Sequence, residues 1–158
     1  MLALTTSASS QVNDLFDDFA VALERMDTKS MSMHYNMPCM LLANDSETAF
    51  TDYGRLEGFF NRGAYAYRQF GIVKVRHEVR MKQEWAEKVF FARLRWHYLD
   101  ADGHLVYHCD YNYILKPDKN GAMKIAMSIS LNERERMQAW KDSLSPDRRP
   151  SIMKLRYV

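Results

Sequence analysis

Residues 92–111 read ARLRWHYLDADGHLVYHCDY, and this stretch decides the fold. At its centre, residues 100–103 (DADG) form a strong turn signal. Apolar and polar side chains alternate on both sides of that turn, with the two-residue period of half-buried strands. The stretch therefore predicts a β-hairpin with one face toward a core. Its aromatic side chains suit either ordinary sheet packing or the lining of a ligand pocket.

The same two-residue period continues beyond this hairpin and predicts a four-stranded antiparallel meander. A second turn signal, PDKNG at residues 117–121, separates the third strand from the fourth. In the first strand, His77 is a misfit among the apolar positions. The four strands are expected at about residues 73–82, 88–99, 104–115 and 123–131.

Helical periods precede the meander. The first forms one apolar stripe, made of Val12, Leu15, Phe16, Phe19, Leu23 and Met26. Residues 51–70 repeat this period and stop at Gly71. Between them, residues 31–38 (MSMHYNMP) predict a short helix ended by Pro38, and residues 39–43 predict a short buried strand. This order predicts an α+β fold, with helices segregated onto one face of the sheet.

The chain is expected to divide near Leu131. Residues 1–131 have the length of a single domain. Residues 132–158 are strongly charged and predict a C-terminal extension, with a short helix to Leu144 followed by a tail.

Side-chain parity also predicts the register of the meander. If Leu99 pairs with His104, Ala92 lies opposite Tyr111 on the inner face and Arg93 opposite Asp110 on the outer face. The same logic predicts one transverse inner row of His77, Ala92, Tyr111 and Met127. Because Ala92 is small and its neighbours in the row are large, this row is the expected floor of a pocket.

Composition excludes several classes of protein. The chain is 47% hydrophobic and 27% charged, so it can bury a core, and its net charge of +2 does not indicate a nucleic-acid partner. We expect no signal peptide in MLALTTSASS, and no apolar run approaches the roughly 20 residues of a membrane helix. The expectation is a cytoplasmic protein in which Cys39 and Cys109 are free thiols, with no nucleic-acid or membrane partner.

This arrangement of elements resembles the nuclear transport factor 2-like superfamily, and within it the SnoaL-like group, over roughly residues 12–131. The resemblance rests on the opening amphipathic helix, FFNRGAYAYRQFG (residues 59–71), the DADG hairpin and NGAMKIAMSIS (residues 120–130). It implies a cystatin-like cone, in which a curved antiparallel sheet wraps around N-terminal helices and leaves a pocket at the open end. It also implies a homodimer formed through the outer sheet face.

Acid–base enzymes of this superfamily place a carboxylate or a His–Asp pair inside the cone. The inner face of the predicted meander holds no Asp or Glu, which argues against steroid-isomerase chemistry. The candidates are therefore His77 as general base, Asp27 as its orienting partner and Tyr111 as a hydrogen-bond donor. The alternative for His77 is a core histidine that bonds a tyrosine.

The predicted function is binding of a small hydrophobic or aromatic molecule, with cofactor-free acid–base chemistry (dehydration, isomerisation or cyclisation) left open. The residues expected to line the pocket are Ala92, Trp96, Tyr107, Tyr113, Met127, His34 and Tyr35. The alternative is a non-catalytic module that dimerises or binds a protein through the outer face, where Phe91 is a candidate anchor.

A metal site is not expected. His104 and His108 share one strand face, but four residues of strand separate them by roughly 13 Å, too far to ligate one ion. The basic outer face could bind phosphate, yet Glu78 and Asp110 interrupt it and no aromatic platform for bases is evident. We therefore expect neither a cofactor nor a metal.

Overall fold

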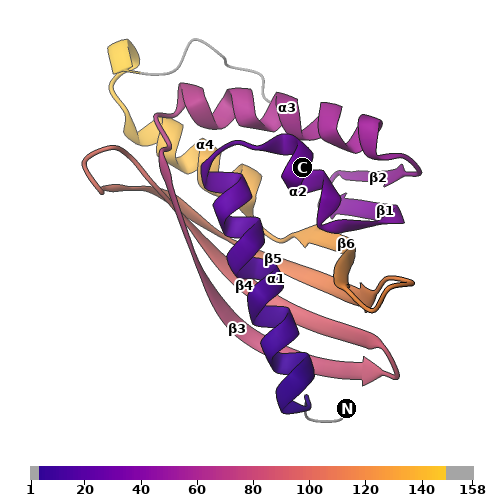
Figure 1. The fold of residues 1–158 in the computed structure, drawn as a ribbon. Coiled ribbons are helices and arrows are strands. Elements are labelled where there is room, and N and C mark those ends of the chain that lie inside the picture. Colours follow the sequence, from indigo (N-terminus) through magenta and orange to yellow (C-terminus); the bar gives the residue numbers. More distant parts are fainter. Residues whose placement is uncertain (1–3, 149–158) are drawn as a thin grey trace.

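A computed structural model describes residues 4–148 of the chain (Figure 1). The helices and strands are α1 (Thr6–Glu24), α2 (Thr28–Met33), β1 (Tyr35–Ala43), β2 (Ser46–Phe50), α3 (Tyr53–Gln69), β3 (Lys74–Ala86), β4 (Val89–Leu99), β5 (Leu105–Pro117), β6 (Met123–Ser130), α4 (Glu133–Ser143) and a 3-10 turn, η1 (Pro146–Arg148). The predicted meander is confirmed as β3–β6. The predicted C-terminal helix is confirmed as α4, and the tail expected after residue 148 lies outside the described residues.

One sheet contains all six strands, in the order β2-β1-β6-β5-β4-β3. Its neighbours are antiparallel except β1 and β6, which run parallel, so the sheet is mixed rather than wholly antiparallel. The predicted short helix at residues 31–38 is half wrong, because α2 ends at Met33 and Pro38 lies inside β1. Edge strand β2 was not predicted.

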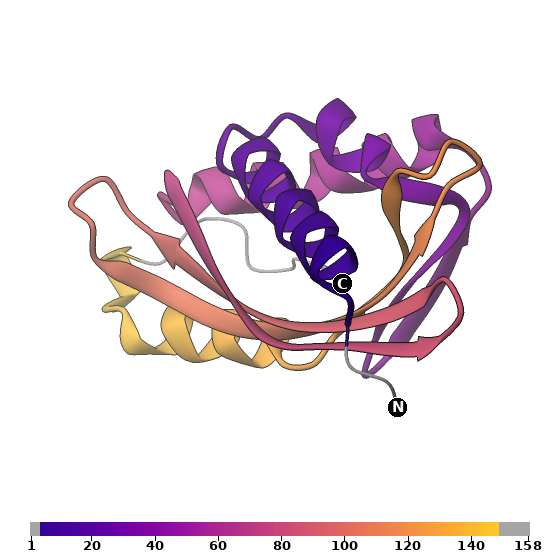
Figure 2. The ribbon, with the colours of Figure 1, turned by 60° about the horizontal axis from the view of Figure 1, so that its bottom comes forward.

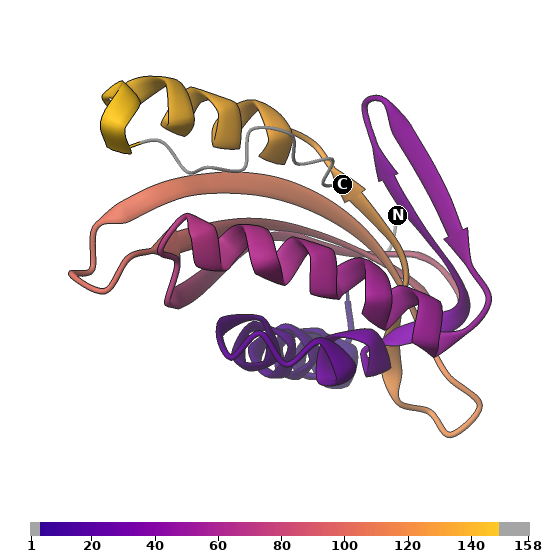
Figure 3. The same cartoon turned by 90° about the horizontal axis from the view of Figure 1, so that it is seen from above.

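The molecule has the expected α+β layers, although only α1, α2 and α3 share one face of the sheet. The sheet curves beneath α1, α2 and α3, which lie in its hollow, while α4 lies on the other side of the strands (Figures 2 and 3). The predicted apolar stripe of α1 is buried against the concave face, except for Met26, which lies beyond the end of the helix and is half-buried. Asp52 caps α3 by accepting from the Arg55 backbone, and Gly71 ends that helix with φ of +73°, a conformation that favours glycine.

The predicted register between β4 and β5 is wrong by two residues. Ala92 pairs with Tyr113, Trp96 with Cys109, and Arg95 rather than Arg93 faces Asp110. Next to the turn, Leu99 pairs with Leu105 instead of His104, which is a difference of one residue from the prediction. A bulge between Leu99 and Tyr98 adds the second residue of the difference. A register difference of two residues preserves side-chain parity. The face of the sheet predicted for each side chain of β4 and β5 is therefore right, but the predicted cross-strand rows are wrong.

The predicted pocket row is therefore not formed. His77 pairs with Trp96 rather than with Ala92. A bulge in β6 between Ile125 and Met127 reverses the parity of that strand, so Ser128 and Ser130 are buried and Met127 pairs with Ile114 on the outer face. The expectation that Met127 lines the floor of the cone was wrong for this reason.

Candidate functional site

A cavity lies between the helices and the concave face of the sheet. Its lining is almost wholly aromatic and aliphatic: Phe19, Leu23, Met31, Tyr35, Leu41, Phe59, Phe60, Tyr67, Trp96, Tyr98, Tyr111, Tyr113 and Ser128. The space between these side chains is about 420 Å³ including the mouth, and about 30 Å³ of it can take the centre of a water molecule. A cavity of this size holds one or two waters with the side chains as they stand.

A buried glutamate adjoins this cavity. Glu133, the first residue of α4, is 1% exposed. Its Oε2 accepts hydrogen bonds from the hydroxyls of Tyr67 and Tyr107, each at 3.0 Å, and its Oε1 accepts from Tyr111 at 2.6 Å. The Cys109 thiol lies 3.5 Å from Oε2. Because Tyr67 and Tyr111 also line the cavity, the carboxyl group sits directly behind its wall.

Burial governs the electrostatics of this cluster. It raises the pKa of the Glu133 carboxyl above its ordinary value, although the tyrosine hydrogen bonds oppose the shift. The Tyr98 hydroxyl lies 3.2 Å from that of Tyr67, and burial raises the pKa of Tyr98 as well. A hydroxyl has one proton, so Tyr67, which donates to Glu133, accepts from Tyr98. The cluster is thus a chain of phenols that ends on a carboxyl group able to hold or release a proton.

The rest of the wall is aromatic and rigidly packed. The indole Nε1–H of Trp96 donates to the Tyr113 hydroxyl at 2.9 Å, and both side chains are buried. Phe19 packs on Trp96 and Tyr35 with its ring edge toward theirs. The Tyr35 hydroxyl shares a hydrogen bond with Ser128. These contacts satisfy the polar groups of Trp96, Tyr113 and Tyr35, whose rings line the cavity.

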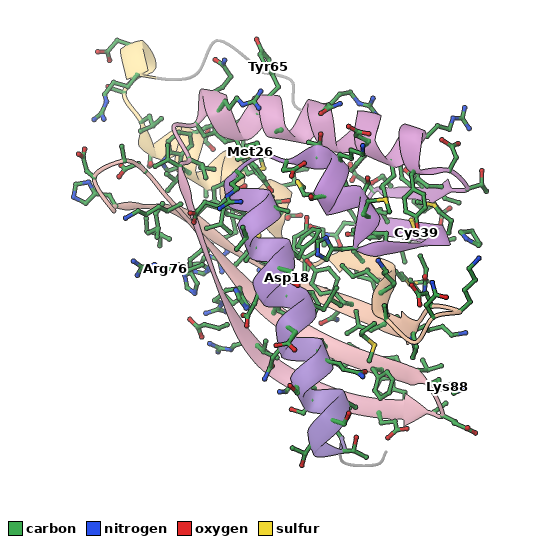
Figure 4. The ribbon with its side chains drawn as sticks, in the orientation of Figure 1. Asp18, Met26, Cys39, Tyr65, Arg76 and Lys88 are labelled. Carbon is green, nitrogen blue, oxygen red and sulfur yellow. The ribbon has the colours of Figure 1, made fainter. Side chains whose placement is uncertain are left out.

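The predicted His77–Asp27 pair is not formed. The Nε2 atom of His77 lies 3.2 Å from a carboxylate oxygen of Asp17 on α1, whereas Asp27 caps α2 by accepting from the Ser30 backbone. The His77 ring packs on Trp96, which lines the cavity, but His77 itself is not among the lining residues. His77 instead lines an open groove between α1 and β3. Arg76, which lines the same groove, is labelled in Figure 4.

The other predicted site residues divide into three groups. Tyr35, Trp96, Tyr111 and Tyr113 line the cavity. Tyr107 contacts Glu133, and His34 contacts the Ser30 carbonyl through Nδ1 while its ring packs on Phe19. Ala92 is fully buried beneath neighbouring side chains and does not form the predicted floor. Both cysteines are free and buried, as expected, and burial raises the pKa of the Cys39 thiol to about 11.

Sequence reasoning missed Glu133, the central residue of the cluster. It occurs in the charged run NERER, where nothing in its own neighbourhood marks it as buried. The one available signal was its position, directly after the last strand. Tyr67 and Tyr98 lie at apolar positions of the helical and strand periods, a pattern that predicts burial but gives their hydroxyls no role.

One group of metal-ligating side chains meets within residues 4–148. Asp100, Asp102 and His104 bring ligand atoms within 4.8 Å of one another in the β4–β5 turn. The Asp100 carboxylate already accepts the backbone N–H groups of Asp102 and His104 there, so this group is a turn structure, and none of its three residues lines the cavity. None of the described helices has the length and apolar character needed to cross a membrane.

Comparison with solved structures shows the same fold in several proteins. A cystatin-like domain of unknown function from Nostoc punctiforme superposes with a TM-score of 0.67 at 13% identity, over 91% of both chains. A ketosteroid isomerase-like protein from Erwinia carotovora atroseptica gives 0.59 at 12% identity, over 80% of this chain and 97% of that one. A protein from Catenulispora acidiphila in complex with S-DNPA gives 0.64 at 12% identity, over 83% and 98%.

Sequence comparison places the chain in a family. No curated protein matches it. A family model described as NTF2-like protein (DUF6841) matches residues 9–133, from α1 to the buried glutamate at the start of α4. The match spans most of the described fold and agrees with the cystatin-like structure from Nostoc punctiforme. The chain therefore belongs to the NTF2-like family DUF6841.

Proposed function

We propose that this protein binds a small, largely apolar ring compound that carries one hydroxyl or carbonyl group. The observation that carries the proposal is the Glu133 carboxyl group, buried behind the wall of an aromatic cavity and bonded to Tyr67 and Tyr111 of that wall. Apolar side chains around a few convergent polar groups are the usual composition of a small-molecule site.

A purely structural role explains this cluster poorly. Burying a carboxyl group costs free energy, and a core of the same volume is often as stable when filled with apolar side chains. Here one carboxyl, three phenols and a thiol converge beside the cavity. A buried titratable group with a raised pKa next to a pocket is the arrangement that ligand recognition and acid–base chemistry require.

Glu133 can act in either protonation state. Protonated, the carboxyl group can donate a hydrogen bond through the cluster to a ligand carbonyl, and ionised, it can take a proton from a ligand hydroxyl relayed by Tyr111. Cofactor-free dehydration, isomerisation or cyclisation is the chemistry that this supports. In this proposal Tyr111 keeps its predicted role as donor, and Glu133 replaces His77, which lies behind Trp96.

Ligand entry requires side chains to move. The free space in the cavity is smaller than a ring compound, so half-buried Phe59 and flexible Met31 must shift to admit one. The protein from Catenulispora acidiphila, which shares this fold, was solved in complex with S-DNPA.

The test compares 2-naphthol with 2-methoxynaphthalene, which has the same rings without a donor, by fluorescence titration. We expect saturable 2-naphthol binding that weakens in Glu133→Gln and Tyr111→Phe, roughly three- to tenfold for one hydrogen bond. Tyr65→Phe, at a tyrosine that is 53% exposed on α3, is the matched control and should bind as the natural protein does (Figure 4). Equal affinity for both probes, or no effect of Glu133→Gln, would remove the proposal.

A second candidate function is homodimerisation through the outer sheet face. Trp85 is 48% exposed and stacks on Phe91, with ring centroids 4.6 Å apart, and Met81 on the same strand is 42% exposed. Phe91, the predicted anchor, is buried under this tryptophan, so Trp85 replaces it as the exposed anchor. Light scattering should give twice the chain mass for the natural protein and the chain mass for Trp85→Asp; a monomer in both would exclude the dimer.

A further inference from the structure

The link between β6 and α4 is fastened to a single residue of β5, Asp110. The Leu131 N–H donates to the Asp110 carbonyl at 3.0 Å, and the Asp110 N–H donates to Oδ1 of Asn132 at 2.8 Å. Nδ2 of Asn132 also lies 3.5 Å from the Asp110 carboxylate. Both residues that precede Glu133 are therefore tied to one point of the sheet.

Asp110 is itself locked in place by Arg95 of β4. Nε and the Nη2 group of Arg95 donate to the two carboxylate oxygens at 2.8 and 3.1 Å, a two-point contact that fixes orientation as well as distance. The guanidinium group lowers the pKa of the Asp110 carboxyl, so it stays ionised. This ion pair lies on the outer face of the sheet, away from the cavity.

Asn132 gives up its ordinary local role to make this contact. It is the N-cap residue of α4, and an asparagine there normally accepts a hydrogen bond from the first turn of its helix. Asn132 makes no such bond, because its side-chain oxygen is bonded to Asp110. The Asn132 side chain therefore bonds the sheet at Asp110 instead of capping α4.

Side chains alternate between the two faces of the sheet along β5, and this alternation links the Asn132–Asp110 contact to Glu133. Asp110 points outward, while its neighbours Cys109 and Tyr111 point inward and meet the Glu133 carboxyl group. The same three residues of β5 therefore hold the backbone before Glu133 on one side and its side chain on the other. We propose that Asn132, held by the Asp110–Arg95 ion pair, is a positioning residue that sets the Glu133 carboxyl group against the cavity wall. This inference rests on the proposed function of Glu133.

The test is Asn132→Ser, because serine caps a helix well but is too short to reach Asp110. The first readout is the pH titration of the Glu133 side-chain carbon by NMR, and the second is 2-naphthol affinity. The groups that face Glu133, and so affect this titration, are Tyr67 of α3, Tyr98 of β4, and Tyr107, Cys109 and Tyr111 of β5. Those around Asp110 are Arg95, His108 and Asn132.

We expect Glu133 in Asn132→Ser to titrate closer to its ordinary pKa of 4.5, because a released carboxyl group regains water, and 2-naphthol binding to weaken roughly three- to tenfold. Asn44→Ala is the matched control: it removes another bond to the first turn of α4, from Asn44 to Glu135, without touching Asp110. It should leave both readouts unchanged.

An unchanged Glu133 titration in folded Asn132→Ser would overturn the positioning role. If that variant does not fold, Arg95→Gln loosens the same contact from β4, should move the titration in the same direction, and overturns the inference if it does not. The two proposals fail separately: absence of 2-naphthol binding in the natural protein removes the proposed function, while the NMR titration still decides whether Asn132 positions Glu133.

Discussion

The Tyr111 hydroxyl donates a 2.6 Å hydrogen bond to Oε1 of Glu133, the shortest of the contacts that this buried carboxyl group receives. Hydrogen bonds to an ionised acceptor are shorter and stronger than neutral ones, so this contact is the main stabiliser of the carboxylate form. Burial acts in the opposite direction and prevails, because the pKa of Glu133 is raised overall. The protonation state of Glu133 therefore depends on a balance that single substitutions can shift.

Glu133→Gln should change how stability depends on pH. A carboxyl group with a raised pKa in the folded state binds more protons there than in the unfolded chain, so its contribution is complete below the ordinary value of 4.5 and is lost as pH rises through the raised pKa. We expect the melting temperature of the natural protein to fall, relative to Glu133→Gln, as pH increases above 4.5. Thermal unfolding at several pH values from 4 to 8 measures this.

The control for that experiment is Glu135→Gln, two residues further along the same helix and exposed. Its melting temperature should follow that of the natural protein at every pH. Parallel curves for the natural protein and Glu133→Gln would contradict the raised pKa.

Tyr111→Phe should destabilise the protein more at pH 8 than at pH 4. The substitution removes a bond that favours the ionised carboxyl group, so the loss is largest where Glu133 is ionised. A hydrogen bond to a charged group is worth about 1.5–3 kcal/mol. Urea unfolding at the two pH values gives the free energy of unfolding of the variant and of the natural protein. An equal destabilisation at both pH values would show that the Tyr111 hydrogen bond does not depend on the charge of Glu133.

Much of the fold could be predicted because period and parity are local properties of the sequence. The stripe of α1 and the four meander strands follow from spacing alone. The rows of residues across the sheet could not be predicted in this way. They depend on bulges beside Leu99 and at residue 126, and no sequence signal marks these bulges. Strand β2 has only five residues, of which Phe50 alone is buried, and this pattern is too weak to separate from a loop.

The candidate site was predicted only in part, for a related reason. Trp96, Tyr111 and Tyr113 line the cavity because strand parity turns them inward. Tyr35 was expected in a short helix, and it lines the cavity from the first position of β1. Glu133 enters from beyond the meander, and its burial depends on where β6 ends and on the tie between Asn132 and Asp110. The partner of His77 likewise depended on the angle at which α1 crosses β3, which spacing does not fix.

Tyr113→Phe should destabilise the protein by about 1–3 kcal/mol, because it leaves the buried Nε1–H of Trp96 without its acceptor. The ring and its packing against Phe16 are retained, so the loss reports the hydrogen bond rather than a cavity. Urea unfolding measures the change in the free energy of unfolding. Tyr65→Phe, which removes an exposed hydroxyl, is the control, and a loss of similar size there would show that the effect is not specific to Trp96.

His108→Gln should make the protein more tolerant of mild acid. Burial lowers the pKa of His108, and the nearby positive charges of Arg136, Arg95 and His97 lower it further, against the opposing Asp110. Its Nδ1 atom is buried without a hydrogen-bond partner among residues 4–148. A histidine whose pKa is lowered on folding contributes stability that is complete above the ordinary value of 6.5 and is lost as pH falls toward the lowered pKa.

The direction of this effect is opposite to that of Glu133, which loses its contribution as pH rises, so each variant isolates one group. The melting temperature of the natural protein should fall between pH 7 and pH 5 more than that of His108→Gln. His104→Gln, at a histidine exposed in the same hairpin, is the matched control and should behave as the natural protein does. If His108→Gln lost as much stability in acid as the natural protein, the pKa of His108 would not be lowered in the folded state. Asp110 would then offset the effect of burial and of the positive charges of Arg136, Arg95 and His97.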